Sequence, residues 1–241
     1  MGVLHETRDK FAYICRQREV DAETPVAVRR LSTAEPPFCR GTEVVIEATV
    51  GDTRGQAIAH DAADWTGTLG DVFAMSLDVA GSRAMVVATL NALAVKLGIV
   101  ERIILCRQHD PLRCGPELVN RLFARFADVR KVFVVGLQPA VVEALVDRLG
   151  ADNVRVVDHD AEDIGQLHSG VRVGDGAADI SKDVAWCELM LVTGESVVDG
   201  TLDELLTISH DASKPLVFFG NTIAAVAAVA ELERVCPLGL N

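Results

Sequence analysis

Four segments of this sequence place glycine or a carboxylate directly after a run of aliphatic residues. They are Gly136-Leu-Gln-Pro139, Asp158, Thr193-Gly-Glu-Ser196 and Gly220-Asn-Thr222. Glycine lets backbone N–H groups approach a ligand, and burial shifts a carboxylate toward the neutral form that acid–base chemistry needs. We therefore take Asp158, Glu195 and Thr193 as candidate catalytic residues, with the Thr193 and Thr222 hydroxyls orienting an anionic substrate. One such glycine alone is more often a turn residue, but three together favour a ligand site.

Cys106, His109 and Cys114 form a candidate metal site, because thiolates and imidazole suit soft and borderline ions and all three fall in one predicted loop. Cys236 is a further candidate. The sequence shows no fourth ligand and no CxxC pair, so a thiol pair near a surface histidine is the commoner arrangement. The six cysteines are expected to be thiols rather than a disulfide framework.

His-Asp pairs recur at nearly even spacing, at His60, His109, His159 and His210. Their flanking residues are unrelated, and they do not lie on the helical frame of an HD-type phosphohydrolase, so we interpret the spacing as chance. The run Asp158-His-Asp160 offers ligands for a divalent ion, although acidic residues after a strand are usually solvated.

Common catalytic motifs are absent from the sequence, including GxSxG, the Walker loop and HExxH. Asp158 follows Gly136 at close to the spacing of about 20 residues at which an acidic residue meets a ribose in dinucleotide-binding folds. Only one of the three expected glycines is present after the strand, which disfavours NAD. An adenosyl or other ribose-bearing ligand stays open.

Aliphatic strands and helices alternate in the C-terminal part and must position these residues. The predicted strands are Lys131–Val135, Val154–Val157, Leu189–Val192 and Leu216–Phe219. Predicted helices lie at 116–126, from Pro139 to Gly150, after a capping box at Thr201, and at 222–231. Strands that alternate with helices pair in parallel through right-handed crossovers, so their carboxyl ends meet at one edge of the sheet.

The N-terminal part predicts a small α+β unit. It consists of a helix at 4–18, an extended or looped segment at 21–40, a hairpin of 42–50 and 53–60, and a helix from the N-cap Ser82 to Leu97. The predicted fold class is therefore α/β. A small α+β domain covers residues 1–98, and a Rossmann-like parallel sheet with flanking helices covers residues 99–241.

Composition limits the classes of partner. The formal net charge is −12 and no Lys/Arg cluster is present, which argues against nucleic-acid binding. The N-terminal residues do not form a signal peptide, and the longest apolar stretch, 222–230, is too short to span a bilayer. We expect a cytoplasmic protein without membrane contact. The exposed hairpin edge makes a homodimer plausible.

Several segments resemble the heavy-metal chelation family, once catalogued only as a domain of unknown function. They are LVTGESVVDGTLDELL (191–206), KPLVFFGNTIAAVAAVAELERVCPLG (214–239), VFVVGLQPAVVEAL (132–145) and SRAMVVATLNAL (82–93). The resemblance implies an enolase-N-terminal-like domain, a Rossmann-like domain with partial likeness to methyltransferases, and a site in the cleft between them. The matched residues expected to line this cleft are Asn91, Gly136, Gln138, Pro139, Thr193, Gly194, Thr201, Gly220, Asn221 and Thr222.

Three functions remain open from the sequence. The first is an enzyme that acts on a small molecule or metal complex in the interdomain cleft; the resemblance implies metallophore-like or pterin-like biosynthesis, or heavy-metal handling. The second is a non-catalytic protein that binds a metal or metallophore. The third is an S-adenosylmethionine-dependent transferase, with Gly136 and Asp158 around the nucleoside. The candidate cofactors are accordingly a divalent metal ion or S-adenosylmethionine.

Overall fold

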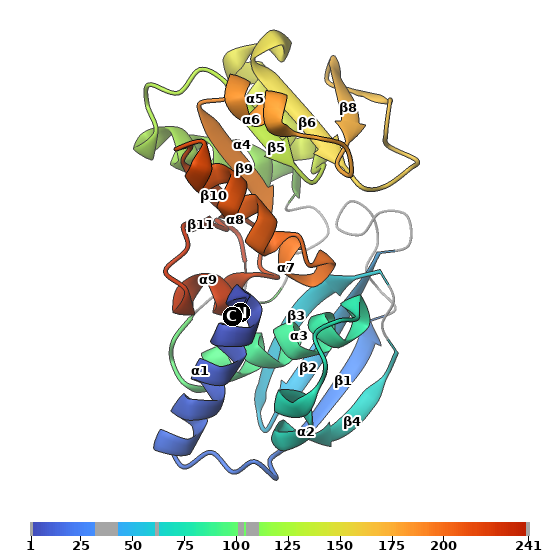
Figure 1. Ribbon diagram of the computed structural model, residues 1–241, viewed down its shortest axis with the longest axis vertical. Coiled ribbons are helices and arrows are strands. Elements are labelled where there is room, and N and C mark those ends of the chain that lie inside the picture. Colours follow the sequence, from blue (N-terminus) through green and yellow to red (C-terminus); the bar gives the residue numbers. More distant parts are fainter. Residues whose placement is uncertain (1, 32–42, 61–62, 101–103, 105–110, 240–241) are drawn as a thin grey trace.

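The computed structural model describes residues 2–31, 43–60, 63–100, 104 and 111–239, which form two sheets (Figure 1). The smaller sheet is antiparallel, in the order β3-β2-β1-β4, with strands β1 (Pro25–Leu31), β2 (Val44–Val50), β3 (Thr53–Ala59) and β4 (Trp65–Thr68). β2 and β3 are the predicted hairpin, and Gly51 at its turn has a φ of 65°. Sequence reasoning missed β4, and it left residues 25–31 as an extended or looped segment. These residues are extended, and they form an inner strand that pairs with both β2 and β4.

Three helices accompany the small sheet: α1 (Val3–Gln17), α2 (Leu69–Ala74) and α3 (Ala80–Lys96). α3 packs on β2 and β3, where Gly55 lies so close to Ala88 and Ala92 that any side chain at this position would collide with the helix backbone. The predicted N-cap was wrong. α3 begins at Ala80 after Val79, so Ser82 lies inside its first turn.

The larger sheet is parallel except at one edge and has the order β11-β10-β9-β5-β6-β8-β7. Its strands are β5 (Val132–Val135), β6 (Val154–Asp158), β7 (Leu167–His168), β8 (Val171–Asp175), β9 (Leu189–Thr193), β10 (Leu216–Phe219) and β11 (Arg234–Val235). The parallel pairing of the four predicted strands is confirmed. The sequence reading did not find β7, β8 or β11. β7 and β11 have two residues each and lie at the two edges, whereas β8 has five residues and lies between β6 and β7. The sequence also predicts a short strand at 102–105, a range that lies outside the described residues except for Ile104.

The helices of this part are α4 (Pro111–Arg125), α5 (Pro139–Leu149), α6 (Ser181–Trp186), α7 (Ser196–Asp199), α8 (Leu202–Asp211) and α9 (Ala224–Val229), with a short 3-10 turn at Ala151–Asn153. Thr201 is the N-cap of α8, but its side chain makes no capping bond, so the predicted capping box does not form. α4 and α5 cover one face of the parallel sheet, where they bury Val132 and Val134. Because side chains alternate across a strand, Phe133 and Val135 face the opposite way.

That opposite face joins the two sheets. Phe133, Met190 and Phe218 belong to the same apolar cluster as Ile46 of the small sheet and Leu90 of α3. In Figure 1 the small sheet lies beyond one end of the parallel sheet, with α7 and α9 between them. The domain boundary after residue 98 stays a prediction. No helix in the described ranges combines the length and apolarity needed to cross a membrane.

Candidate functional site

A cavity of about 790 Å³ opens at the carboxyl ends of the central parallel strands. After β5 the chain adds β6 on one side, and it later adds β9 on the other, so the strand order reverses at β5. Such a reversal leaves a crevice between the two diverging connections. The loops after β5, β6 and β9 line this cavity, together with Glu43 and His60 from the ends of the small sheet.

Acidic side chains dominate the lining. Its titratable members are Glu43, His60, Asp158, His159, Asp160, Glu162, Glu195 and Asp199. None of the described residues around the cavity is Lys or Arg. We call this space the acidic cavity. Its carboxylates are unfavourable for the anionic substrate expected from the glycine loops, because like charges repel one another.

Glu195 has the most perturbed carboxyl group of the site. Burial is the largest cause that raises its pKa well above the usual value, and the negative charges of Glu43, Asp199 and Asp158 raise it further. A hydrogen bond from the Thr193 side chain opposes this shift. Glu195 is half-buried, and its pKa is shifted toward the neutral form, in which a carboxyl can donate a hydrogen bond or a proton.

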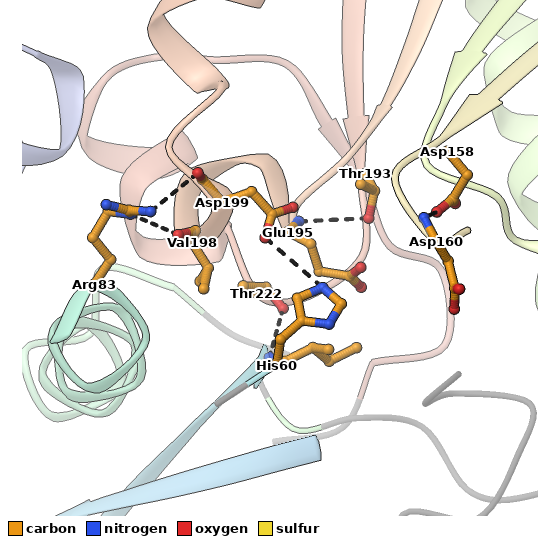
Figure 2. Close-up of polar contacts among 10 residues, drawn as sticks. His60, Arg83, Asp158, Asp160, Thr193, Glu195, Val198, Asp199 and Thr222 are labelled. Carbon is orange, nitrogen blue, oxygen red and sulfur yellow. Dashed lines mark hydrogen bonds and ion pairs between the residues drawn. The ribbon is translucent and has the colours of Figure 1, made fainter. Parts of the chain in front are cut away.

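Asp199 connects the parallel sheet to the small sheet. Its Oδ1 lies 4.0 Å from His60 Nε2, and Arg83 of α3 donates from Nη2 to the Asp199 carbonyl at 3.0 Å (Figure 2). Burial raises the pKa of Asp199, while His60, His159 and Arg83 lower it. Arg83 also donates from Nε to the Val198 carbonyl at 2.6 Å. The guanidinium thus holds the C-terminal end of α7 in place beside the cavity.

Asp158 is held by the backbone. Its Oδ2 accepts from the Leu137 N–H at 2.5 Å, and its Oδ1 accepts from the Asp160 N–H at 2.8 Å. Oδ2 therefore connects the end of β6 to the loop after β5, and Oδ1 fixes the start of the loop after β6. This arrangement positions the two loops, and a ligand that approaches Asp158 has to share oxygens that are already engaged.

Ser196 is the first residue of α7 and lies on the cavity wall. Its side chain is 2% exposed, and its Oγ has no hydrogen-bond partner among the described residues. A buried hydroxyl without a partner costs about 1–3 kcal/mol, so such groups call for an explanation. A ligand in the acidic cavity would supply the missing partner.

A second, smaller pocket of about 90 Å³ adjoins the acidic cavity, since Gln138, Thr193, Glu195 and Phe219 line both spaces. Its remaining walls come from β3, α4, α5, β11 with the residue after it, the loops after β9 and β10, and Ile104. They comprise Ile58, Ile104, Cys114, Gly115, Leu118, Val141, Gly194, Gly220, Asn221, Thr222, Val235 and Cys236. We call this space the apolar pocket.

The structure brings most of the predicted site residues together. Gly136, Gln138, Asp158, Thr193, Glu195 and Thr201 line the acidic cavity. Gly194, Gly220, Asn221, Thr222 and Cys114 line the apolar pocket. Cys106 and His109 lie outside the described residues. Pro139 lines neither space and instead begins α5 at the position where its missing N–H costs nothing. The roles of all these residues stay predictions.

Asn91 lines neither the acidic cavity nor the apolar pocket. The side chain is fully buried, and its Nδ2 donates to the Gln56 and Thr222 carbonyls, both at 2.9 Å. Its Oδ1 accepts from the Ala225 N–H at 2.9 Å. Thr222 is similarly occupied, since its Oγ1 accepts from the Ile58 N–H at 3.2 Å. These bonds attach the loop after β10 to α3 and β3.

The donor groups of the described residues do not form a site for a bare metal ion. No three His, Cys, Asp or Glu side chains among the described residues are grouped closely enough to hold an ion. Carboxylate and imidazole groups suit divalent cations in general. The acidic cavity therefore fits a cation that fills more of its volume than a bare ion, such as a metal complex with its own ligands.

Sequence reasoning missed several residues of the cavity. His60 and His159 both line it, although their His-Asp pairs were interpreted as chance; His159 was also considered from the sequence as a ligand for a divalent ion. Asp199 and Ser196 belong to the same loop and short helix as Glu195, so their nearness along the chain was a usable signal. Glu43 and His60 gave no such signal, because their position depends on how the small sheet packs.

Comparison with known proteins agrees with this architecture. Residues 122–232 match the DUF364 family, which is described as "Putative heavy-metal chelation". A DUF364 protein of unknown function from Pyrococcus horikoshii has a similar structure, with a TM-score of 0.53 and 15% identity, covering 92% of this chain and 79% of that one. Another from Desulfitobacterium hafniense has a TM-score of 0.52 and 17% identity, covering 95% and 83%. At such identities the likeness shows the fold. No curated protein matches the chain in sequence.

Proposed function

Because residues 122–232 match the heavy-metal chelation family, we propose that the protein binds a positively charged metal complex or small organic cation in the acidic cavity. The lining carries this proposal, since six carboxyl and two imidazole side chains surround the cavity without Lys or Arg among its described residues. Several carboxylates close together repel one another, and a bound cation relieves that repulsion.

The size and polarity of the cavity support a complex over a bare ion. At about 790 Å³ it has the volume of a small-molecule site. Carboxylates that do not converge on one point can still accept hydrogen bonds from the N–H or water ligands of a complex. The Ser196 Oγ, which has no partner within the described chain, offers a further hydrogen bond to the same ligand.

Hexaamminecobalt(III) tests the proposal, because this inert complex binds only through charge and its N–H groups. We expect binding by isothermal titration, and none by the anionic counterpart hexacyanocobaltate(III). The double variant Glu195→Gln/Asp199→Asn should weaken binding by about ten-fold or more, a change of roughly 1.4 kcal/mol. The control Glu143→Gln/Asp147→Asn removes two exposed carboxylates of α5 and should change affinity little. Equal effects of both variants, or preference for the anion, would contradict the proposal.

Acid–base catalysis at Glu195 is a second candidate, favoured by its raised pKa. In this role Glu195 donates a proton to a bound substrate, Asp158 orders the two loops, and Thr193 orients Glu195. The experiment uses a ligand extracted from the purified protein and followed by mass spectrometry. Wild-type protein should convert that ligand, whereas Glu195→Gln should bind it unchanged. If both leave it unchanged, the protein is a binder.

S-adenosylmethionine belongs to the same charge class, because it carries a sulfonium and an ammonium group. Gly136 and Asp158 would border its nucleoside. A ligand at a hundred times its Kd adds about 2.7 kcal/mol of stability, so a thermal shift detects it. No shift at millimolar concentration removes this ligand. A cytoplasmic location and a homodimer remain predictions, to be checked by cell fractionation and analytical ultracentrifugation.

A further inference from the structure

Four residues line both the acidic cavity and the apolar pocket: Gln138, Thr193, Glu195 and Phe219. Adjoining spaces with shared walls can be filled by one molecule. Resting on the proposed function, we infer that the ligand is a cation that carries a compact apolar group, with the charge in the acidic cavity and the apolar group in the apolar pocket.

The residues that line the acidic cavity and those that line the apolar pocket differ in chemistry. Among the described residues of the apolar pocket, Glu195 is the only one with a carboxyl, imidazole, guanidinium or ammonium group. Leu118, Val141 and Phe219 provide buried hydrocarbon, and Cys114 and Cys236 add polarizable sulfur. A charged group would lose its hydration here and find Glu195 as its one charged partner among the described lining residues, whereas an apolar group would leave water favourably.

Two glycines limit the width of this pocket and leave its interior free of their side chains. A side chain on Gly194 would meet Ile223 at 2.9 Å, so the loop after β9 lies directly against the start of α9. Gly220 has a φ of 92°, and the space where its side chain would stand holds no atom within 4 Å. A volume of about 90 Å³ admits an apolar group of a few carbon atoms and excludes a long chain.

Glu195 lies at the boundary between the two spaces. Its pKa is raised by burial and by the carboxylates on the acidic side, so a cation placed there favours its ionised form. The apolar group of the same ligand would then cover Glu195 from the other side. One ligand would thus be bound by charge complementarity in the acidic cavity and by burial of its apolar group in the apolar pocket.

A series of primary ammonium ions tests the inference: methyl-, ethyl-, propyl-, butyl- and hexylammonium, titrated against the full-length protein with ligand-detected NMR. Burying one methylene contributes about 0.8 kcal/mol, so affinity should rise about four-fold per added carbon. The rise should stop once the pocket is full, near propyl- or butylammonium. Neutral alcohols of the same length should bind more weakly than the ammonium ions.

Two variants place an aromatic ring in the pocket, Cys236→Phe and Cys114→Phe, so that one remains informative if the other misfolds. Either should abolish the dependence of affinity on chain length while methylammonium still binds. Leu112→Phe, at an exposed position of α4, adds the same ring elsewhere and should leave the dependence intact.

The outcomes separate this inference from the proposed function. If methylammonium and hexaamminecobalt(III) bind but added carbons change nothing, the inference is overturned and the cation site stands. If no cation binds, the proposed function itself fails. If chain length matters equally in wild type and in both ring-filled variants, the apolar group binds somewhere else and the inference is again overturned.

Discussion

His60 Nε2 lies 4.0 Å from Asp199 Oδ1, and this pair connects the end of the small antiparallel sheet to α7 of the parallel half across the acidic cavity (Figure 2). The two residues come from distant parts of the chain and meet because one apolar core joins the two sheets. The acidic cavity therefore depends on both sheets.

Cation binding should release protons and strengthen as the pH rises. The pKa values of Glu195 and Asp199 are raised mainly by burial, so these groups retain protons at a pH where ordinary carboxyls are ionised. A cation favours the ionised forms and lowers both pKa values, which releases protons on binding. Titrations of hexaamminecobalt(III) in buffers of different ionisation enthalpy measure this release. Affinity that is constant from pH 5 to pH 8 would contradict the prediction.

In the absence of a ligand, Glu195 and Asp199 should make the protein less stable as the pH rises. Above the usual carboxyl pKa of about 4, the unfolded chain has released protons that Glu195 and Asp199 still hold in the fold. The unfolded state then binds fewer protons, so the free energy of unfolding falls until the pH passes the raised pKa values. Glu195→Gln should reduce this slope and stabilise the protein at neutral pH by about 1 kcal/mol. Urea unfolding at several pH values measures it, with Glu143→Gln as the exposed control.

Asn91→Leu should destabilise the protein by about 2–4 kcal/mol. Leucine has a similar volume, but it leaves the Gln56 and Thr222 carbonyls and the Ala225 N–H without the bonds that Asn91 makes. Chemical denaturation measures the loss. Asn153→Leu removes a side chain with one local bond, to the Leu149 carbonyl, and should cost less than half as much. Similar losses at both positions would show that the connection through Asn91 contributes little.

Gly136→Ala should be more harmful than Gly165→Ala. Both glycines have a positive φ, 91° and 86°, so a side chain at either position costs about 1–2 kcal/mol of backbone strain. A side chain on Gly136 would also collide with Thr193 at the point where the strand order reverses, whereas that of Gly165 meets no atom within 4 Å. Overpacking should add about 1–3 kcal/mol at Gly136. Thermal unfolding of both variants measures the difference, and equal losses would argue against close contact between the loops.

Much of the parallel half was predictable because its signals are local. The apolar runs at β5, β6, β9 and β10 are mostly buried and are followed by glycine or a polar residue, which is typical of parallel strands. The pattern also predicted that Gly136, Asp158 and Thr193 would gather, since parallel strands end at one edge. The short strands β7 and β11 were missed, because two residues carry too little periodicity to detect.

The small sheet was harder to predict. β1 follows a polar segment and begins at Pro25, and its pairing with β2 and β4 is long-range. The helix start at Ala80 was missed because a nearby serine offered a better local capping residue than Val79. In both places the packing of the whole molecule outweighed local preference.

By itself the sequence determined the α/β class, the parallel direction of the central strands and the convergence of their glycine-bearing ends, because each follows from residue types that are close along the chain. Only the tertiary structure decided that Glu43 and His60 complete the cavity, that Asn91 supports it from below, and that its lining is acidic. These features depend on how one sheet packs on the other, and such packing joins residues whose separation along the chain leaves no local pattern.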